Sequence, residues 1–380
     1  MLYISYAGIL ILSIDSQIFP ALLSQIKSTS LRQGILLSAL FILFPFAASF
    51  VGWIAERIGK KAILISGSIF MALPFFVASL TGSFWILTLA VLFFGIGMGS
   101  VEGQTTALIS DTFPGKERSL INISQIFFSL GAAGGPFLIT FSYLIFPSLK
   151  LSAIYTSAWI ITVLLAIGFT LVKTREATHV PERKVKIRDL LSDRTWKLLA
   201  LSLFLYVSAE SGTVSWLAKY GYLYLKLPAG IAPICITLFW AGLGISRLIV
   251  GTAFHGMSNR KLLILSLSFT LLFQFLTFGT LNPFIALLSI LFLGIGMGPI
   301  WPTLVSVAGS NYRGANSFAV GSLVAMGGLA MSLIQPIIGF LSRESLLGLR
   351  GTLLSLSLLT VVNMILLGKP GHKETVPEAP

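Results

Sequence analysis

Three acidic residues stand inside long apolar stretches of this 380-residue chain, and they are the side chains best placed for chemistry. Asp15 lies in the first apolar stretch, Glu102 in the fourth and Glu210 in the seventh, whereas the other ten of the 13 acidic residues fall between stretches or near the ends. A carboxyl group in apolar surroundings holds a proton readily, until water or a cation reaches it. We expect Asp15 and Glu102 to bind a proton. For each of the three, a structural hydrogen bond between helices is the alternative.

Amide and indole side chains add a second kind of chemistry within the apolar stretches. Asn122 and Gln125 offer both donors and acceptors, which suits a neutral ligand with many hydroxyl groups. Trp216, Trp240 and Trp301 each combine an apolar ring face with one N–H donor, which suits the C–H face of a sugar ring. Hydrogen bonding between helices explains the two amides equally well.

The elements that must hold these side chains are membrane-spanning helices. Hydrophobic residues make up 55% of the chain and charged residues 10%, and the mean hydropathy is +0.92. Apolar runs of about 20 residues cross roughly 30 Å of hydrocarbon as helices, and the runs are too continuous for barrel strands. The expected fold is an all-α integral membrane protein with twelve spans. These are 2–23, 34–55, 62–80, 85–110, 120–146, 151–172, 197–225, 231–254, 262–280, 284–309, 316–341 and 351–367.

An internal repeat divides the twelve spans into two related halves. The stretch Leu92–Gly99 returns almost unchanged 199 residues later as Leu291–Gly298, and Gly59–Ser66 matches Asn259–Ser266. Parallel repeats of this kind place a binding site where the halves meet. We expect the repeated glycines to serve close helix packing. The expected units are an N-terminal half 1–172, a cytoplasmic linker 173–196, a C-terminal half 197–368 and a cytoplasmic tail 369–380.

Basic residues predict how the spans are oriented. With the first residue inside, 18 of the 26 lysines and arginines fall on the cytoplasmic side and six on the outer side. This bias predicts a multi-pass protein of the cell membrane with both termini in the cytoplasm. Lys219 lies near an outer span end, and we interpret it as extending to the interface. Because the basic residues flank apolar spans, the net charge of +13 is not interpreted as a nucleic-acid surface.

The remaining chemistry-bearing residue types do not form a recognisable site. Cys235 is the single cysteine, and His179, His255 and His372 are scattered over loops and the tail. The sequence contains no phosphate loop or catalytic triad pattern. We therefore expect no metal, no cofactor and no enzymatic activity.

A loop near the start of the chain carries a family resemblance. The run from Gly52 to Lys61 contains a glycine, the acid-base pair Glu56-Arg57, a second glycine and two lysines. It resembles the signature loop between the second and third helices of the major facilitator superfamily. A degenerate copy follows the eighth span and is preceded by Arg247. The resemblance implies gating roles at the inner surface for Glu56, Arg57 and Arg247.

Further stretches resemble the fucose, galactose and glucose symporter family within that superfamily. They are Asp15 before Pro20, the glycine-rich approach to Glu102, Asn122 and Gln125 before Phe127, Tyr206 to Glu210, Phe239 to Gly242, and Trp301 to Ser306. The resemblance implies a cation-coupled sugar importer in which Asp15 and Glu102 couple protons and contact sugar. The coupling cation is expected to be a proton, with sodium as the alternative, and the protein is expected to act as a monomer. The expected substrate contacts are Asp15, Glu102, Asn122, Gln125, Glu210, Trp216, Trp240 and Trp301.

Two other functions compete with sugar import. An exporter of drugs or small amphipathic metabolites, driven by proton antiport, would also use acids within the membrane because they attract lipophilic cations. A cavity dominated by aromatic side chains would favour the exporter. A sensor that binds ligand without transport is disfavoured, because the linker and tail leave no room for a signalling domain.

Overall fold

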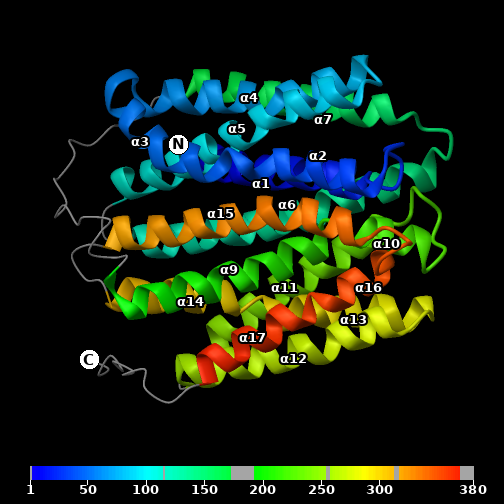
Figure 1. Ribbon diagram of the computed structural model, residues 1–380. Coiled ribbons are helices and arrows are strands. Elements are labelled where there is room, and N and C mark those ends of the chain that lie inside the picture. The colour runs from blue at the N-terminus through cyan, green and yellow to red at the C-terminus, as the bar shows by residue number, and fades with distance from the viewer. Residues whose placement is uncertain (1, 114–115, 173–191, 254–256, 312–315, 369–380) are drawn as a thin grey trace.

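Helices arranged as rods side by side make up the computed structural model (Figure 1). It describes residues 2–113, 116–172, 192–253, 257–311 and 316–368. Eleven helical stretches are long and apolar enough to cross a membrane, and a shorter apolar helix over Ile234–Val250 makes the twelfth, which confirms the expected fold class. The first six rods are α1 (Leu2–Ala21), α2 (Ser30–Ile42) with α3 (Phe44–Ile58), α4 (Lys60–Leu80), α5 (Phe84–Thr112), α6 (Glu117–Ile145) and α7 (Leu151–Leu171). The last six are α9 (Arg194–Val214) with α10 (Leu217–Leu223), α11 (Ile234–Ala253), α12 (Asn259–Gly279), α13 (Pro283–Met297) with α14 (Ile300–Asn311), α15 (Asn316–Leu341), and α16 (Gly348–Ser355) with α17 (Ser357–Gly368).

Four of the rods in the described chain are broken into two helices, where the sequence predicts continuous spans. Pro45 stands in the first turn of α3, and Pro299 separates α13 from α14. Proline has no N–H and crowds the preceding turn, so it interrupts the backbone ladder at both points. Between α9 and α10 the backbone tightens instead, because Trp216 donates its N–H to the carbonyl of Thr213.

The rods form two six-helix bundles that pack along their length (Figure 1). In the first half α4 packs against α5 and α7, and α1 packs against α6. In the second half α13 packs against α11 and α12, and α9 packs against α15. The halves touch mainly where α15 crosses α2 and α11 crosses α6.

The repeated glycines lie at tight helix crossings, as the sequence predicts. A Cβ atom on Gly97 would lie 2.4 Å from the carbonyl oxygen of Gly67, and one on Gly296 would lie 2.8 Å from the Thr270 hydroxyl. Gly103 is different, because a Cβ atom there would meet no atom within 4 Å. The glycines of the repeated stretch therefore allow close helix packing, whereas Gly103, just beyond that stretch, does not.

In each half, a basic side chain donates hydrogen bonds to the carbonyls at the end of a helix. Lys61 Nζ donates to the carbonyls of Thr170 and Val172 at 2.6 and 2.9 Å, at the end of α7. Arg260 Nε donates to the carbonyl of Leu367 at 3.2 Å, at the end of α17. Helix ends expose unpaired carbonyls and partial negative charge, so a cation stabilises them. A contact of this kind occurs in both halves, although the aligned repeat pairs Arg260 with Lys60 and not with Lys61.

The halves are joined by hydrogen bonds at one end of the bundle. We name this the closed end, and it comprises the turns 22–29, 224–233 and 342–347 with the adjoining helix ends. Gln25 donates to the carbonyl of Ala229 at 3.5 Å, and the Tyr143 hydroxyl donates to Gln25 at 2.9 Å. A Cβ atom on Gly339 would lie 2.5 Å from the carbonyl oxygen of Ser30, so α15 and α2 nearly touch there. The sequence predicts these turns on the outer side.

Candidate functional site

Asp15 is enclosed within the first half. It is 1% exposed, and its Oδ2 accepts a hydrogen bond from the Thr162 hydroxyl of α7 at 2.7 Å. The same hydroxyl lies 2.8 Å from the carbonyl oxygen of Ala158. A hydroxyl has one proton to donate, so Thr162 serves two acceptors with a single donor.

Glu102 lies on α5, which packs against α1. Its side chain is half-buried, and among the described residues no hydrogen bond or ion pair holds its carboxylate. Its backbone carbonyl accepts from the Thr106 hydroxyl at 3.0 Å. Gly103, the next residue, faces open space. Both predicted proton-binding acids thus lie in the first half, Asp15 enclosed and Glu102 half-buried.

Glu210 lies in the second half within a polar cluster. It is 7% exposed and lies beside the Tyr206 hydroxyl, within electrostatic reach of the Arg247 guanidinium. Tyr206 donates to the carbonyl of Met297 at 2.9 Å, and Arg247 Nε donates to the carbonyl of Gly298 at 3.4 Å. These carbonyls stand where α13 breaks, so the cluster supplies the donors that the interrupted helix lacks.

Arg247 also reaches across to the first half. Its Nη1 donates to the Ser129 hydroxyl of α6 at 3.4 Å, where α6 and α11 meet. Glu56 and Arg57 lie exposed in the last turn of α3. Of the three residues for which the family resemblance implies gating, Arg247 thus lies at the α6–α11 crossing, and Glu56 and Arg57 lie on α3.

The three tryptophans occupy different environments. Trp240 is 8% exposed, and its ring meets Phe128 of the first half edge-on, with 5.7 Å between ring centres. Its buried N–H has no hydrogen-bond partner among the residues that the structure describes. Trp301 is half-buried, with its ring against Gly327 of α15. Trp216 is fully buried, and its N–H donates to Gln335 at 2.9 Å. Among the described residues, Trp240 therefore combines burial with an N–H donor that has no partner.

The two predicted amides lie on α6, which contacts the second half. Gln125 is half-buried, and its backbone carbonyl accepts a hydrogen bond from the Ser129 hydroxyl at 3.1 Å. Asn122 belongs to the same helix, but its side chain lies outside the described residues. Residues 173–191 of the predicted linker 173–196 and the tail, 369–380, are outside them as well. The end of the predicted linker belongs to α9, which begins at Arg194.

Sequence reasoning missed several polar partners. Thr162 and Tyr206 hold the buried acids, yet a threonine or tyrosine in an apolar span carries no distinguishing signal. Lys219 does not extend to the interface. Its Nζ donates to Ser30 at 2.9 Å and to Gln33 at 2.5 Å, both on α2 of the opposite half. The one available signal was its three-residue spacing from Trp216, whose ring it covers.

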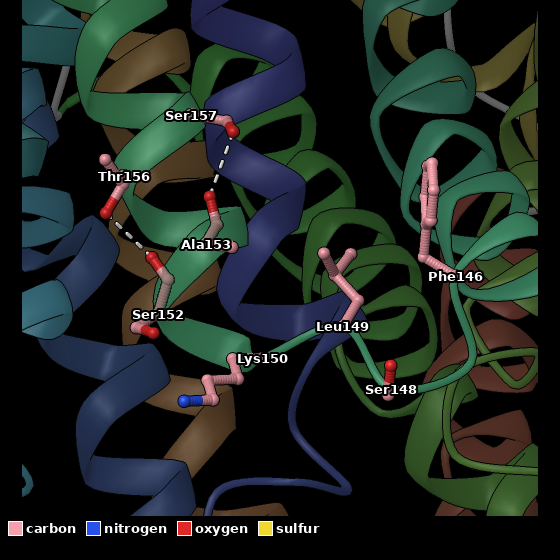
Figure 2. Close-up of a pocket in the computed structure, with 8 residues that line it drawn as sticks. All are labelled: Phe146, Ser148, Leu149, Lys150, Ser152, Ala153, Thr156 and Ser157. Atoms are coloured by element: carbon pink, nitrogen blue, oxygen red, sulfur yellow. Dashed lines mark hydrogen bonds between the residues drawn. The ribbon is translucent and has the colours of Figure 1, made fainter.

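A surface pocket of about 580 Å³ lies apart from these residues, at the turn between α6 and α7 (Figure 2). It is lined by Phe146, Ser148, Leu149, Lys150, Ser152, Ala153, Thr156 and Ser157. The hydroxyls of Thr156 and Ser157 donate to carbonyls of their own helix at 2.9 Å (Figure 2). The lining contains no acidic side chain, so the pocket does not share the chemistry of the central residues.

Known proteins resemble the chain in sequence and fold. A candidate glucose/galactose transporter of Helicobacter pylori strain J99 is 24% identical over 307 residues, which are 76% of this chain and 74% of that protein. The fucose:proton symporter FucP of Escherichia coli matches with a TM-score of 0.64 and 18% identity over 97% of each chain. A D-xylose-proton symporter matches with a TM-score of 0.80 and 12% identity, over 97% of this chain and 96% of that one. The family model of the major facilitator superfamily matches residues 6–334. The chain is therefore a member of the major facilitator superfamily, a family of membrane transporters and not of enzymes.

Proposed function

We propose that this transporter imports a monosaccharide together with a proton, by exposing a site between its halves alternately to each side. The observation that carries the proposal is the enclosed Asp15 carboxylate, held by a hydroxyl that has a second acceptor. Asp15 and Glu102 bind the coupling proton, and the sugar lies between them and the second half.

The Thr162 hydroxyl suits a carboxyl group that gains and loses a proton. When Asp15 is ionised, the hydroxyl donates to it across 2.7 Å. When Asp15 is protonated, the hydroxyl turns to the Ala158 carbonyl and accepts from Asp15 instead. In either state the Thr162 hydroxyl and Asp15 Oδ2 keep a hydrogen bond, and losing such a bond inside the protein would cost about 1–3 kcal/mol.

The second half supplies groups that suit a sugar. The unpartnered N–H of Trp240 can donate to a hydroxyl oxygen, and the half-buried ring of Trp301 offers an apolar face. Gln125 adds an amide on α6. The names of the glucose/galactose, fucose and xylose transporters that resemble the chain support this substrate class.

The closed end supports an assignment of this structure to one step of the proposed cycle. Because the basic-residue bias predicts the turns of this end on the outer side, the conformation is assigned as inward-facing. Glu102 and the cluster around Arg247 then face the side from which a sugar leaves.

Transport in proteoliposomes tests the proposal. Labelled glucose, galactose and fucose are offered under an inward pH gradient, a sodium gradient or no gradient. We expect accumulation that needs the pH gradient, and we expect Glu102→Gln to abolish it while the control Glu344→Gln, at an exposed loop acid, leaves it intact. Accumulation under sodium alone, or unchanged uptake in Glu102→Gln, contradicts proton coupling through Glu102.

The same preparation separates import from export. Absence of uptake for every sugar under every gradient, together with pH-driven expulsion of a cationic dye, would replace the symporter with a proton-antiport exporter. A sugar that raises the melting temperature supports the symporter, because a ligand selective for the folded state stabilises it.

A further inference from the structure

Lys219 places an ammonium group at the junction of the two halves. It lies half-buried on α10, and both of its oxygen partners, Ser30 and Gln33, belong to α2 of the opposite half. Its Nζ also lies 5.3 Å from the centre of the Trp216 ring. Within the described residues no carboxylate forms an ion pair with it.

The oxygen partners are held in place by their own contacts. Gln33 is 3% exposed, and its amide nitrogen donates to the carbonyls of Leu23 and Ile26 at 3.0 and 2.8 Å. Its oxygen is thereby fixed toward the lysine. Ser30 lies where α2 and α15 nearly touch, beside Gly339.

The lysine side of the junction is fixed as well. The Trp216 ring beneath the ammonium is fully buried and anchored through its N–H to Gln335. Gln335 in turn donates to the hydroxyls of Ser211 and Ser215 at 3.0 and 3.2 Å. The groups on both sides of this contact, Gln33 on α2 and Trp216 beneath Lys219, are therefore held in place by other hydrogen bonds before they meet.

We propose that Lys219, Ser30 and Gln33 form a latch that holds the closed end shut. Closing this end removes water from the ammonium, and oxygens of the opposite half replace that water. A buried charge that loses its partner is far less stable than a buried neutral group. When the end opens, water solvates the lysine again. The acceptors on α2 thus control how often this end is closed.

If the latch acts through the buried charge, Lys219→Met should reverse the effect of Gln33→Met on the closed end, which a packing contact alone would not do. Gln33→Met removes an acceptor while the charge stays, so it opens the closed end. Adding Lys219→Met removes the charge as well, so the double variant closes again. If Gln33 acted only by holding the end of α1 through Leu23 and Ile26, then Lys219→Met would not rescue it.

Spin-label distances across the closed end test the latch. Labels are attached to Lys27→Cys and Ser345→Cys, which are exposed in turns of opposite halves, in a Cys235→Ala background that removes the single native cysteine. We expect Gln33→Met to raise the ratio of long to short distances about tenfold, the effect of one charge-assisted hydrogen bond. The double variant Gln33→Met/Lys219→Met should return most of the way to the parent distribution.

Two controls keep the outcome decisive. Lys150→Met removes an exposed lysine outside the latch and should leave the distances unchanged. Melting temperatures show whether each variant folds, and Ser30→Ala provides a milder loss of acceptor if Gln33→Met does not fold. An unchanged distribution in the acceptor variants, or a shift that Lys219→Met does not reverse, overturns the latch. Because no substrate is used, the result does not depend on sugar transport.

Discussion

Thr162 donates its hydroxyl proton to Asp15 across 2.7 Å and thereby ties α7 to α1 inside the first half. The same hydroxyl faces the Ala158 carbonyl at 2.8 Å, so the carboxyl group can change its proton count without disturbing the helices around it. The relationship separates two properties of Asp15 that mutation can test individually: its capacity to accept a hydrogen bond and its capacity to bind a proton.

Asp15→Asn should abolish uphill transport without unfolding the protein. The asparagine oxygen still accepts from Thr162, but an amide does not bind a proton near neutral pH. We expect the accumulation ratio under a pH gradient to fall by at least about tenfold, the equivalent of 1.4 kcal/mol. Exchange of labelled for unlabelled substrate, which needs no net proton movement, should persist. Unchanged accumulation in this variant would remove Asp15 from the coupling machinery.

Replacing each of two tryptophans by phenylalanine should have different consequences. Trp240→Phe keeps a ring against Phe128 but loses ring volume and the unpartnered N–H, so we expect a higher KM for substrate and a smaller fall in melting temperature than in Trp216→Phe. Trp216→Phe leaves the Gln335 oxygen buried without its donor, at a cost of about 1–3 kcal/mol. We expect its melting temperature to fall by about 2–4 °C per kcal/mol. Equal effects of the two changes would contradict this assignment.

Alanine at two glycines of α5 should shift stability in opposite directions. Gly97→Ala forces a methyl group to 2.4 Å from the Gly67 carbonyl, and the required backbone shift costs about 1–3 kcal/mol. Gly103→Ala meets open space and gains up to about 1 kcal/mol of helix propensity. Melting temperatures of the purified variants measure the difference. A stable Gly97→Ala protein would show that α4 and α5 can move apart easily.

Arg260→Gln should lower stability, whereas Lys261→Gln should not. Arg260 donates to the last carbonyls of α17, and the loss of a hydrogen bond from a charged group costs about 1.5–3 kcal/mol. Lys261 is exposed beside it and serves as the matched control. Thermal unfolding of both variants provides the comparison. We expect the KM for substrate to stay at the parent value, because the contact lies at the end of a helix away from the acids.

The fold class could be predicted from the sequence because membrane-spanning helices require long apolar runs with few charged residues. Apolar runs of about 20 residues have few alternative structures in a bilayer, so the twelve spans followed from hydropathy. The Leu92–Gly99 repeat predicted two halves, and the crossing at Gly97 confirms the packing role of its glycines. None of the four helix breaks was predicted, and those at Trp216 and Leu356 have no proline or glycine at the break that could have indicated them.

The candidate site was less accessible to sequence reasoning. Hydropathy singled out Asp15, Glu102 and Glu210 because a charge in an apolar span is rare. The contacts of Thr162 and Tyr206 with these acids were not predicted. Threonine and tyrosine are common in such spans, and these two meet the acids only through tertiary packing. The role of Lys219 depended on where α10 lies against α2, which a spacing pattern along one chain segment does not encode.

The broken rods make the two halves mechanically unequal despite their related sequences. In the described chain the first half has one break, between α2 and α3, and the second half has three. A continuous helix resists bending along its whole length, whereas a break concentrates bending at one or two residues. Prolines inside α1, α4 and α6 add bending points to the first half, so the breaks make the second half the more interrupted one without making the first half rigid. The breaks at Trp216 and at Pro299 give the second half two points at which it can bend internally, in addition to any movement of one half against the other.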